Sequence, residues 1–267
     1  MPWVRYREKT ETTKKRGWVG MDQTWLIENW AFQWILGNFL IYLAVFVVAL
    51  RINYDFNIIM VGMIYLLPLI PYGWGATIGP RFMLQSTQNM VFGIIELVIF
   101  VITVKPTDAT FDRAHVKQLV GHTLPIAAAL IGLSYVSRMS DVPLSRYEWV
   151  IIVVVFSVGS VMRVMAVYQL GPQAFKFDIV FRDQQVLRQE KLYSWIRHPS
   201  YTAMMIVILA YALTTHHWLA GGLGLASAWF GFQYRIHHEE KALLAQFGEE
   251  YVEYRNKTGM WFPKRMW

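Results

Sequence analysis

Seven apolar stretches, separated by short polar segments, run along the chain. Their residue numbers are 30–50, 57–78, 88–104, 121–137, 147–170, 200–215 and 217–235. A helix that spans a bilayer needs about 20 mostly apolar residues, and most of these stretches approach or reach that length. The pattern therefore predicts an all-α, polytopic membrane helical bundle of about seven transmembrane helices, with six to eight as the range.

Proline and glycine positions add detail to this bundle. Pro68 and Pro71 lie inside the second stretch, which predicts that this helix is kinked or broken. The last two stretches are joined only around His216, which predicts an antiparallel helical hairpin. The seventh stretch carries Gly221, Gly224 and further small residues, and small residues allow helices to approach closely in lipid.

The composition agrees with a membrane protein. Hydrophobic residues make up 55% of the 267 residues and charged residues 16%, whereas soluble domains carry about 25% charge. The net charge is +7, but the basic residues lie at the ends of apolar stretches, where they face lipid headgroups, so nucleic-acid binding is not expected. The chain has no cysteine, which excludes disulfides, thiolate metal sites and a cysteine nucleophile.

Two polar regions are long enough to hold a functional site, the loop 171–199 and the tail 235–267. Both flank the final hairpin, so both are expected on one side of the membrane. Together they contain eleven Lys or Arg residues, and the positive-inside rule places such segments in the cytoplasm. Five crossings before the loop would put the basic N-terminus outside, so either the second stretch does not cross or the helix number differs by one. Tail residues 239–254 have helical spacing and predict an amphipathic helix at the membrane surface.

The segment around Pro199 offers a place for an anion. Proline suits the first position of a helix and disfavours helix for His198 before it. The first backbone N–H groups, those of Ser200, Tyr201 and Thr202, would then point at the polar loop and suit a carboxylate. An ordinary proline-initiated helix explains the same residues, and the spacing alone favours that simpler interpretation.

Arg235 and Glu239 share one helix face because they are four residues apart. They form either a surface ion pair, which contributes only about 0.5 kcal/mol, or part of a site for a charged ligand. Arginine before glutamate is the weaker order for a helical ion pair. Glu239 and Glu240 together at a membrane boundary also need a cation nearby, so the pattern favours the ligand.

Glu96 and Arg163 lie inside predicted spans, where an ionisable residue is a functional candidate by default. The alternative is that they pair with each other or with water inside the bundle, and the sequence favours neither. The histidines are too scattered for a metal site, and neighbouring His237 and His238 project about 100° apart on a helix. No metal is expected.

Two motifs in the last third of the chain resemble the isoprenylcysteine carboxyl methyltransferase family. The first is Arg-His-Pro-Ser-Tyr at 197–201. The second combines Glu239-Glu240 with Phe-Gly-Glu-Glu-Tyr-Val-Glu-Tyr at 247–254. The likeness covers about residues 178–263, with both motifs in the family's order and the hairpin between them. It implies a membrane methyltransferase that uses S-adenosylmethionine.

The resemblance also implies site residues. The family's cofactor-binding residues correspond here to a tyrosine, the motif after it, a glutamate and a backbone cradle near 185–188, namely Tyr193, His198, Pro199, Ser200, Tyr201, Glu239, Val186 and Leu187. Arg235 matches the arginine beside the methyl-acceptor carboxylate and is the expected catalytic residue. The expected partners are a lipid or prenylated small-molecule substrate and the membrane lipids themselves.

Three positions depart from the family's pattern. Lys191 stands where the family often has a glycine two residues before the tyrosine, and Ala203 stands where a glycine commonly follows the motif. Asp178 replaces a glutamine that contacts the cofactor, unless Gln184 or Gln185 takes that role. These departures bear on the identity of the methyl acceptor more than on the identity of the methyl donor.

The sequence thus predicts N-terminal helices of unassigned role over 1–146 and a catalytic core over 147–267. The resemblance implies methyl transfer from S-adenosylmethionine to the carboxylate of an isoprenylcysteine-like acceptor at the cytoplasmic face. A phospholipid N-methyltransferase is an alternative, since that family has a similar cofactor region. An NADPH-dependent sterol-type reductase is the alternative from another class, although such enzymes more often carry an Arg-Asp pair at Glu239-Glu240.

Overall fold

The computed structural model describes residues 23–71, 79–103, 113–171 and 186–264. The helices there are α1 (Gln23–Ile52), α2 (Phe56–Leu69), α3 (Pro80–Thr103), α4 (Arg113–Gln118), the π-helical turn η2 (Leu119–Thr123), α5 (Leu124–Arg138), α6 (Arg146–Leu170), the 3-10 turn η3 (Lys191–Ser194), α7 (Pro199–Thr215), α8 (Trp218–Phe247) and α9 (Glu249–Lys257). Within this described part, β-pairing is limited to an isolated bridge between Ile196 and Gly259. The predicted all-α class is confirmed.

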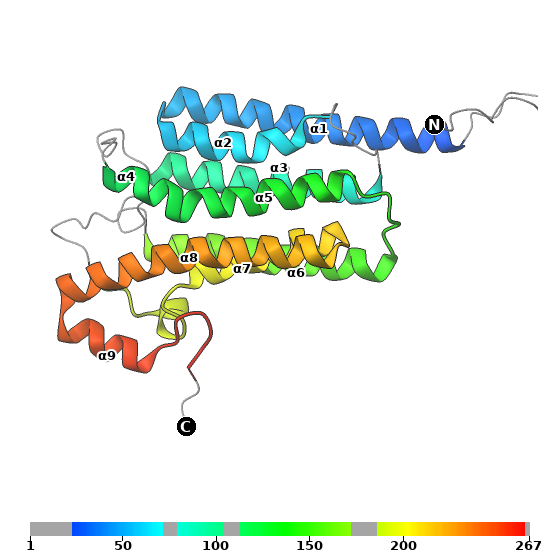
Figure 1. Ribbon diagram of the computed structural model, residues 1–267. Helices are drawn as coiled ribbons and strands as arrows, with labels where there is room; N and C mark the ends of the chain where they lie inside the picture. The colour runs from blue at the N-terminus through cyan, green and yellow to red at the C-terminus, as the bar shows by residue number, and fades with distance from the viewer. Residues whose placement is uncertain (1–22, 72–78, 104–112, 172–185, 265–267) are drawn as a thin grey trace, which may run out of the picture.

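The long helices lie side by side along a common direction (Figure 1). Helices α1, α2 and α3 pack together on one side, and α6, α7 and α8 pack together on the other. Helix α5 lies between the two groups and contacts α2, α3, α7 and α8. Helix α9 lies beyond the bundle, next to the C-terminal end of α8. The described loop and tail segments therefore meet at one end of the bundle.

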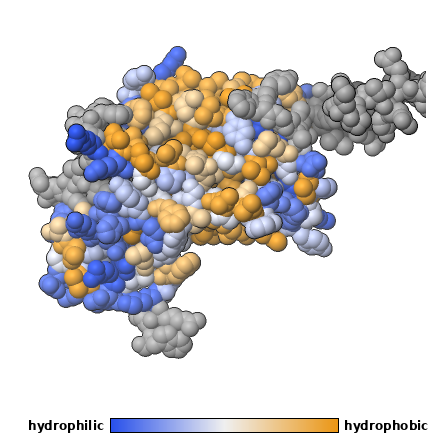
Figure 2. Space-filling view, in the orientation of Figure 1, coloured by the Kyte–Doolittle hydropathy of each residue, from blue (hydrophilic) through white to orange (hydrophobic). Residues whose placement is uncertain are grey.

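Apolar side chains cover the outside of the bundle. On α6, Val154, Val158 and Val161 are each more than half exposed, whereas Arg163 on the same helix is 2% exposed. This arrangement suits a lipid environment, because lipid solvates valine but not an isolated charge. Figure 2 shows hydrophobic residues over most of the bundle and hydrophilic residues gathered over the end that carries α9.

Four helical segments in the described part are long and apolar enough to cross a membrane, namely 30–52, 80–103, 116–138 and 146–170. Helices α2 and α7 are apolar but shorter, with 14 and 17 residues. A polytopic membrane bundle is therefore confirmed, and each of the seven predicted stretches contains a helix. That all seven cross the membrane stays a prediction.

The structure agrees with one predicted helix break and differs from one predicted helix. Helix α2 ends at Leu69, directly after Pro68, in agreement with a broken second stretch, while residues 72–78 lie outside the described part. The prediction of one surface helix over 239–254 is wrong. Helix α8 continues without interruption to Phe247, and α9 begins after Gly248, whose φ of +53° glycine adopts without strain.

Small residues allow α8 to pack closely against α5 and η2, as the sequence predicts. A Cβ atom at Gly224 would lie 2.8 Å from the Leu133 side chain, and one at Gly231 would lie 2.8 Å from the His122 carbonyl oxygen. Both distances are too short for a side chain to be added without movement. This close contact fixes the position of η2 relative to the charged residues further along α8.

Candidate functional site

The first turn of α7 uses its own backbone groups for hydrogen bonding. The backbone N–H groups of Tyr201 and Thr202 both donate to the carbonyl oxygen of His198, at 3.1 Å. The two groups are therefore not available to an anion, and the simpler interpretation of the Pro199 segment holds for them.

The tail after α9 folds back onto the segment before α7. The backbone N–H of Arg197 donates to the Gly259 carbonyl at 2.8 Å, and that of Gly259 donates to the Trp195 carbonyl at 3.2 Å. The Arg197 guanidinium adds a bond to the Thr258 carbonyl at 2.5 Å, and the Thr202 hydroxyl donates to the Trp261 carbonyl at 3.0 Å. The loop and the tail therefore form one structural unit, as the sequence predicts.

Glu240 is held by two basic side chains of the motif. Arg197 Nε donates to Glu240 Oε1 at 2.9 Å, and His198 Nε2 lies 3.2 Å from the same oxygen. Burial alone would raise the pKa of the Glu240 carboxyl, but the hydrogen bonds from His198 and Arg197 lower it to about 2. Glu240 is therefore ionised and fixes the orientation of His198.

Glu239 joins Tyr201 to Arg235. Its Oε1 accepts a hydrogen bond from the Tyr201 hydroxyl at 2.5 Å and one from Arg235 Nε at 2.6 Å. Burial opposes ionisation of Glu239, but Arg235 and then His198 hold the pKa of its carboxyl below the ordinary value. The side chains of Arg235 and Glu239 are 4% and 22% exposed, so the two residues form a largely buried pair, and the surface ion pair considered from the sequence is excluded.

The structure brings only some of the predicted cofactor-binding residues together. The structure brings His198, Tyr201 and Glu239 together, with the His198 and Tyr201 rings stacked at 5.7 Å between centroids. Tyr193 is buried between helices, where its hydroxyl donates to the Ala166 carbonyl at 3.2 Å and burial raises its pKa.

The remaining predicted residues lie before or beside this cluster. Pro199 and Ser200 are buried in the first turn of α7. Val186 is 67% exposed and Leu187 is half-buried, and among the described residues no hydrogen bond joins either to the cluster. Gln184, Gln185 and Asp178 lie outside the described part. Cofactor binding by these residues stays a prediction.

The two charges inside the bundle bind each other. Arg163 Nε donates to Glu96 Oε1 at 2.7 Å, and its second terminal nitrogen donates to Glu96 Oε2 at 2.9 Å. The other terminal nitrogen donates to the Ser200 hydroxyl. The pairing considered from the sequence is thus present, and it also joins α3 and α6 to the first turn of α7.

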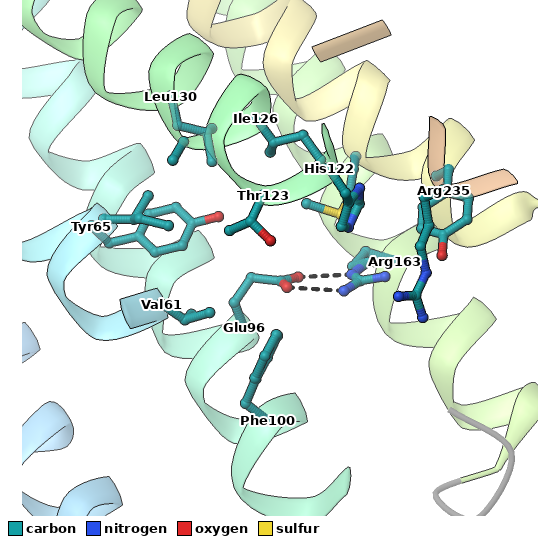
Figure 3. A pocket seen from close by; sticks show the side chains of 14 residues that line it. Val61, Tyr65, Glu96, Phe100, His122, Thr123, Ile126, Leu130, Arg163 and Arg235 are labelled. Carbon is teal, nitrogen blue, oxygen red and sulfur yellow. Dashed lines mark hydrogen bonds and ion pairs between the residues drawn. The ribbon is translucent and has the colours of Figure 1, made fainter. Parts of the chain in front are cut away.

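A cavity of about 640 Å³, counted as all space between atoms and including its open side, adjoins both charge clusters. Figure 3 shows Glu96 and Arg163 together in its wall, with Arg235 beside Arg163. The remaining wall is mostly apolar and comes from α2, α3, η2–α5 and α7, with Val61, Phe100 and Leu130 among its residues. The N-terminal helices, which the sequence left without a role, therefore form much of this cavity.

Sequence reasoning missed four polar residues of this end of the bundle. Arg197 and Glu240 lie within the two motifs, so the motifs themselves could have identified them as site residues. His122 and Thr123 line the cavity from η2, and the only signal was two polar residues at the start of an apolar stretch.

One departure from the family pattern coincides with an unusual backbone conformation. Lys191 has a φ of +56°, in the left-handed region that favours glycine. The position where the family often has glycine is therefore the position where a side chain is strained. A second departure, Ala203, is fully buried, and its carbonyl oxygen would lie 3.0 Å from a Cβ atom at Gly159 on α6.

Comparison with known proteins places residues 150–245 in a match to the isoprenylcysteine carboxyl methyltransferase (ICMT) family. Protein-S-isoprenylcysteine O-methyltransferase of Saccharomyces cerevisiae is 32% identical over 107 residues, which are 39% of this chain and 44% of that protein. The protein of the same name from Xenopus laevis is 40% identical over 85 residues, or 31% of this chain and 29% of that protein. The chain spans about half or less of the length of the first curated relatives that it matches.

A solved structure of the eukaryotic intramembrane Ras methyltransferase isoprenylcysteine carboxyl methyltransferase aligns with 87% of this chain and 97% of its own, at 18% identity and a TM-score of 0.41. The resemblance inferred from the two motifs is confirmed by the family match. The curated relatives all carry the same methyltransferase name, which does not favour the phospholipid N-methyltransferase or the reductase.

Proposed function

We propose that this chain transfers a methyl group from S-adenosylmethionine to the carboxylate of an isoprenylcysteine-like, lipid-linked acceptor at the cytoplasmic membrane face. One observation supports this above the others. The Tyr201–Glu239–Arg235 cluster lies within the segment that matches the family and adjoins an otherwise largely apolar cavity. A polar methyl-transfer site and a place for an apolar chain are thus neighbours.

The cluster fits a cofactor that carries a sulfonium and an amino-acid group. Among the described residues Glu239 Oε2 accepts no hydrogen bond, since His198 Nδ1 is 3.7 Å away, and the Glu239 side chain is 22% exposed. The Tyr201 ring is stacked with the rings of His198 and Phe232, at 5.7 Å and 5.4 Å between centroids, so the cluster is rich in aromatic rings, which attract cations. When bound, the cofactor supplies an electrophilic methyl group. We assign its binding to Tyr193, His198, Pro199, Ser200, Tyr201, Glu239, Val186 and Leu187.

Arg235 is proposed to orient the acceptor. A carboxylate has a reference pKa near 4 and is ionised at neutral pH, so it needs no general base. The chain must instead hold the acceptor oxygen in line with the methyl group and exclude water. Arg235 lines the cavity while its Nε is bound to Glu239. Glu239 therefore balances part of the guanidinium charge while Arg235 orients the acceptor carboxylate. The apolar wall formed by Val61, Ile64 and Leu130 would contact the lipid chain.

The proposed cytoplasmic orientation follows from charge. The hydrophilic surface gathers at the α9 end (Figure 2), and the loop and tail carry eleven basic residues in the sequence. Since the chain has no cysteine, one cysteine introduced at the exposed Glu253 can be labelled selectively. A membrane-impermeant maleimide should label it in inside-out vesicles and not in intact cells. The reverse result would contradict this orientation.

The reaction can be tested with purified protein in liposomes, radiolabelled S-adenosylmethionine and N-acetyl-S-farnesyl-L-cysteine. A methyl ester is cleaved by alkali and releases volatile labelled methanol, whereas an N-methyl group is stable, so the same assay separates the two acceptor types. We expect alkali-labile label in the lipid extract. Glu239→Gln should weaken cofactor binding, and Glu253→Gln, at an exposed pair with Lys257, is the matched control. Absence of transfer, or label that resists alkali, would contradict the proposal.

A further inference from the structure

Two large aromatic side chains are exposed at the polar end of the bundle. Trp195 directly follows η3 and is 60% exposed, and Phe262 lies in the tail and is 74% exposed. Both lie outside the four segments that are long and apolar enough to cross a membrane. The backbone joins their segments, because the Gly259 N–H donates to the Trp195 carbonyl at 3.2 Å and Gly259 pairs with Ile196. The loop and the tail thus present two aromatic side chains outside the bundle.

Hydrogen bonds place η3 beside the last turns of α6. The Leu192 N–H donates to the Gln169 side-chain oxygen at 3.0 Å, and the Tyr193 hydroxyl donates to the Ala166 carbonyl at 3.2 Å. Helix α6 has 25 residues and is one of the four possible membrane spans. Its length is therefore about 37 Å, against a hydrocarbon core about 30 Å thick. The last turns of α6 come at the edge of that core, so Trp195, directly after η3, lies at the level of the lipid headgroups.

The residues at this level resemble an interfacial belt. Tyr168, in the same part of α6, is 81% exposed, and tyrosine and tryptophan are enriched where a membrane meets water. A tryptophan suits this layer because its ring is apolar while its N–H can bond polar groups. Trp195 therefore matches the interfacial layer in kind as well as in level, and the bridge at Gly259 keeps the tail with Phe262 nearby.

Basic side chains accompany the two aromatic residues. Segments 188–195 and 255–264 contain one exposed carboxylate, that of Glu190, and five exposed basic residues, namely Arg188, Lys191, Arg255, Lys257 and Lys264. Lys257 also pairs with Glu253 at 3.6 Å. Other acidic residues of α9 lie in its first turn, at the end of the helix away from the tail. The surface around Trp195 and Phe262 is thus basic, and such surfaces attract anionic lipids.

We propose that the surface formed by residues 188–195 and 255–264 binds the headgroups of anionic phospholipids in the membrane that holds the bundle. Trp195 and Phe262 insert into the interfacial layer, and the ammonium groups of Lys191 and Lys264 contact lipid phosphates. A soluble protein partner fits less well, since the hydrogen bonds of η3 to α6 put this surface against the membrane. The inference does not depend on the proposed reaction, and its test uses no measurement of activity.

A fluorescent label can report this contact, since the chain has no cysteine. One cysteine replaces Phe262 or Trp195 and carries nitrobenzoxadiazole, and the full chain is placed in vesicles of phosphatidylcholine alone or mixed equally with phosphatidylglycerol. Lipid with a doxyl group near the top of its acyl chain should quench both labels, and more strongly in the anionic vesicles. A label at Gln246, exposed at the end of α8 that projects from the bundle (Figure 1), is the control and should be quenched weakly at most.

Charge variants separate binding of anionic lipid from insertion alone. In the chain labelled at Phe262, the ratio of the long-lifetime to the short-lifetime fraction of the label measures inserted against water-exposed label. Lys191→Gln and Lys264→Gln should each lower this ratio about fivefold in the anionic vesicles, as expected for one basic residue at a charged membrane. Neither should change it in phosphatidylcholine alone. Lys117→Gln, at an exposed position of α4 at the same end of the bundle, is the matched control and should have no effect.

The outcomes that overturn this inference are distinct. All the substituted positions are exposed, so the variants should unfold in detergent at nearly the Tm of the unmodified chain. Absence of doxyl quenching at both Phe262 and Trp195 would overturn the membrane contact and leave a soluble partner as the occupant. Equal quenching in the two kinds of vesicle, unaffected by Lys191→Gln and Lys264→Gln, would overturn the binding of anionic headgroups. Neither result bears on the proposed methyl transfer, which the farnesylated acceptor tests separately.

Discussion

The carboxylate of Glu96 and the guanidinium of Arg163 meet at two points inside the bundle, with N–O distances of 2.7 Å and 2.9 Å. Their side chains are 4% and 3% exposed. Arg163 also donates to the Ser200 hydroxyl in the first turn of α7. A charge pair in the interior therefore helps to fix the start of the helix that carries Tyr201, and through it the site.

Glu96→Gln should destabilise the chain strongly. The variant leaves the charge of Arg163 without its carboxylate, and breaking a buried ion pair in this way costs about 3–5 kcal/mol. Thermal unfolding in detergent, followed by tryptophan fluorescence at a fixed scan rate, should show a clearly lower Tm. Glu253→Gln, which breaks an exposed pair whose atoms are 3.6 Å apart, should leave the Tm nearly unchanged. Equal Tm values for the two variants would show that the interior pair does not support the fold.

Glu240 should make stability depend on acidity. Burial raises the pKa of its carboxyl in the folded chain, but His198 and Arg197 lower it to about 2. In the unfolded chain a glutamate titrates near 4.3. A lowered carboxyl pKa stabilises the folded chain above the unfolded value, and this stabilisation is lost as pH falls toward 2. The difference in Tm between the unmodified chain and Glu240→Gln should be largest near pH 6 and should shrink below pH 4. A constant difference over this range would contradict the assignment.

Lys191→Gly should stabilise the loop before Tyr193. A residue with a side chain pays about 1 kcal/mol or more in the left-handed region that Lys191 occupies at a φ of +56°, and glycine does not. The greater freedom of glycine in the unfolded chain offsets part of this gain. Lys191→Ala is the matched control, because it removes the same charge and keeps the strain. The glycine variant should have the higher Tm of the two, and a lower Tm would exclude a strained backbone here.

Gly159→Ala should disturb the contact between α6 and α7. The added Cβ would lie 2.8 Å from the Val207 side chain and 2.9 Å from its backbone nitrogen, and overpacking of this kind costs about 1–3 kcal/mol. Gly132→Ala is the control, since a Cβ there meets nothing within 4 Å and alanine favours helix by up to about 1 kcal/mol. Opposite signs of the change in Tm are expected. If both changes raise the Tm, the two helices are not in close contact at Gly159.

Arg235→Lys should separate acceptor binding from cofactor binding if the proposed function holds. Lysine keeps the charge but loses the planar pair of donors that suits a carboxylate. We expect kcat/KM for the farnesylated acceptor to fall about tenfold or more, while calorimetric affinity for S-adenosylhomocysteine falls much less. Glu239→Gln should show the opposite pattern. Equal losses of both quantities in both variants would mean that the pair acts only through the structure of α8.

Local sequence signals predicted which residues of the candidate site lie together. The order and spacing of the motif residues indicated that His198, Tyr201 and Glu239 belong together, and they do contact one another. The extent of α8 could not be predicted in the same way. Polar residues after Arg235 ended the apolar stretch, but helix formation depends on backbone hydrogen bonds and continues until Gly248 changes the direction of the chain.

The cavity depended on contacts between distant segments. Val61, Glu96, His122 and Arg163 come from four elements that have no motif in common, and only the packing of α2, α3, η2 and α6 brings them around one space. No local pattern predicts which helices become neighbours, because an apolar helix face packs equally well against lipid and against several other helices.

By itself, the sequence determined that this chain is a helical membrane protein and which residues form its polar end. Hydrophobicity over about 20 residues and motif spacing are local properties, and both can be read without a partner. Only the tertiary structure decided that Glu96 binds Arg163 and that the N-terminal helices enclose a cavity beside Arg235. It also decided that the tail pairs with the loop at Gly259 and leaves Trp195 and Phe262 exposed. These outcomes depend on distances between segments far apart in the chain, which the packing of the helices sets.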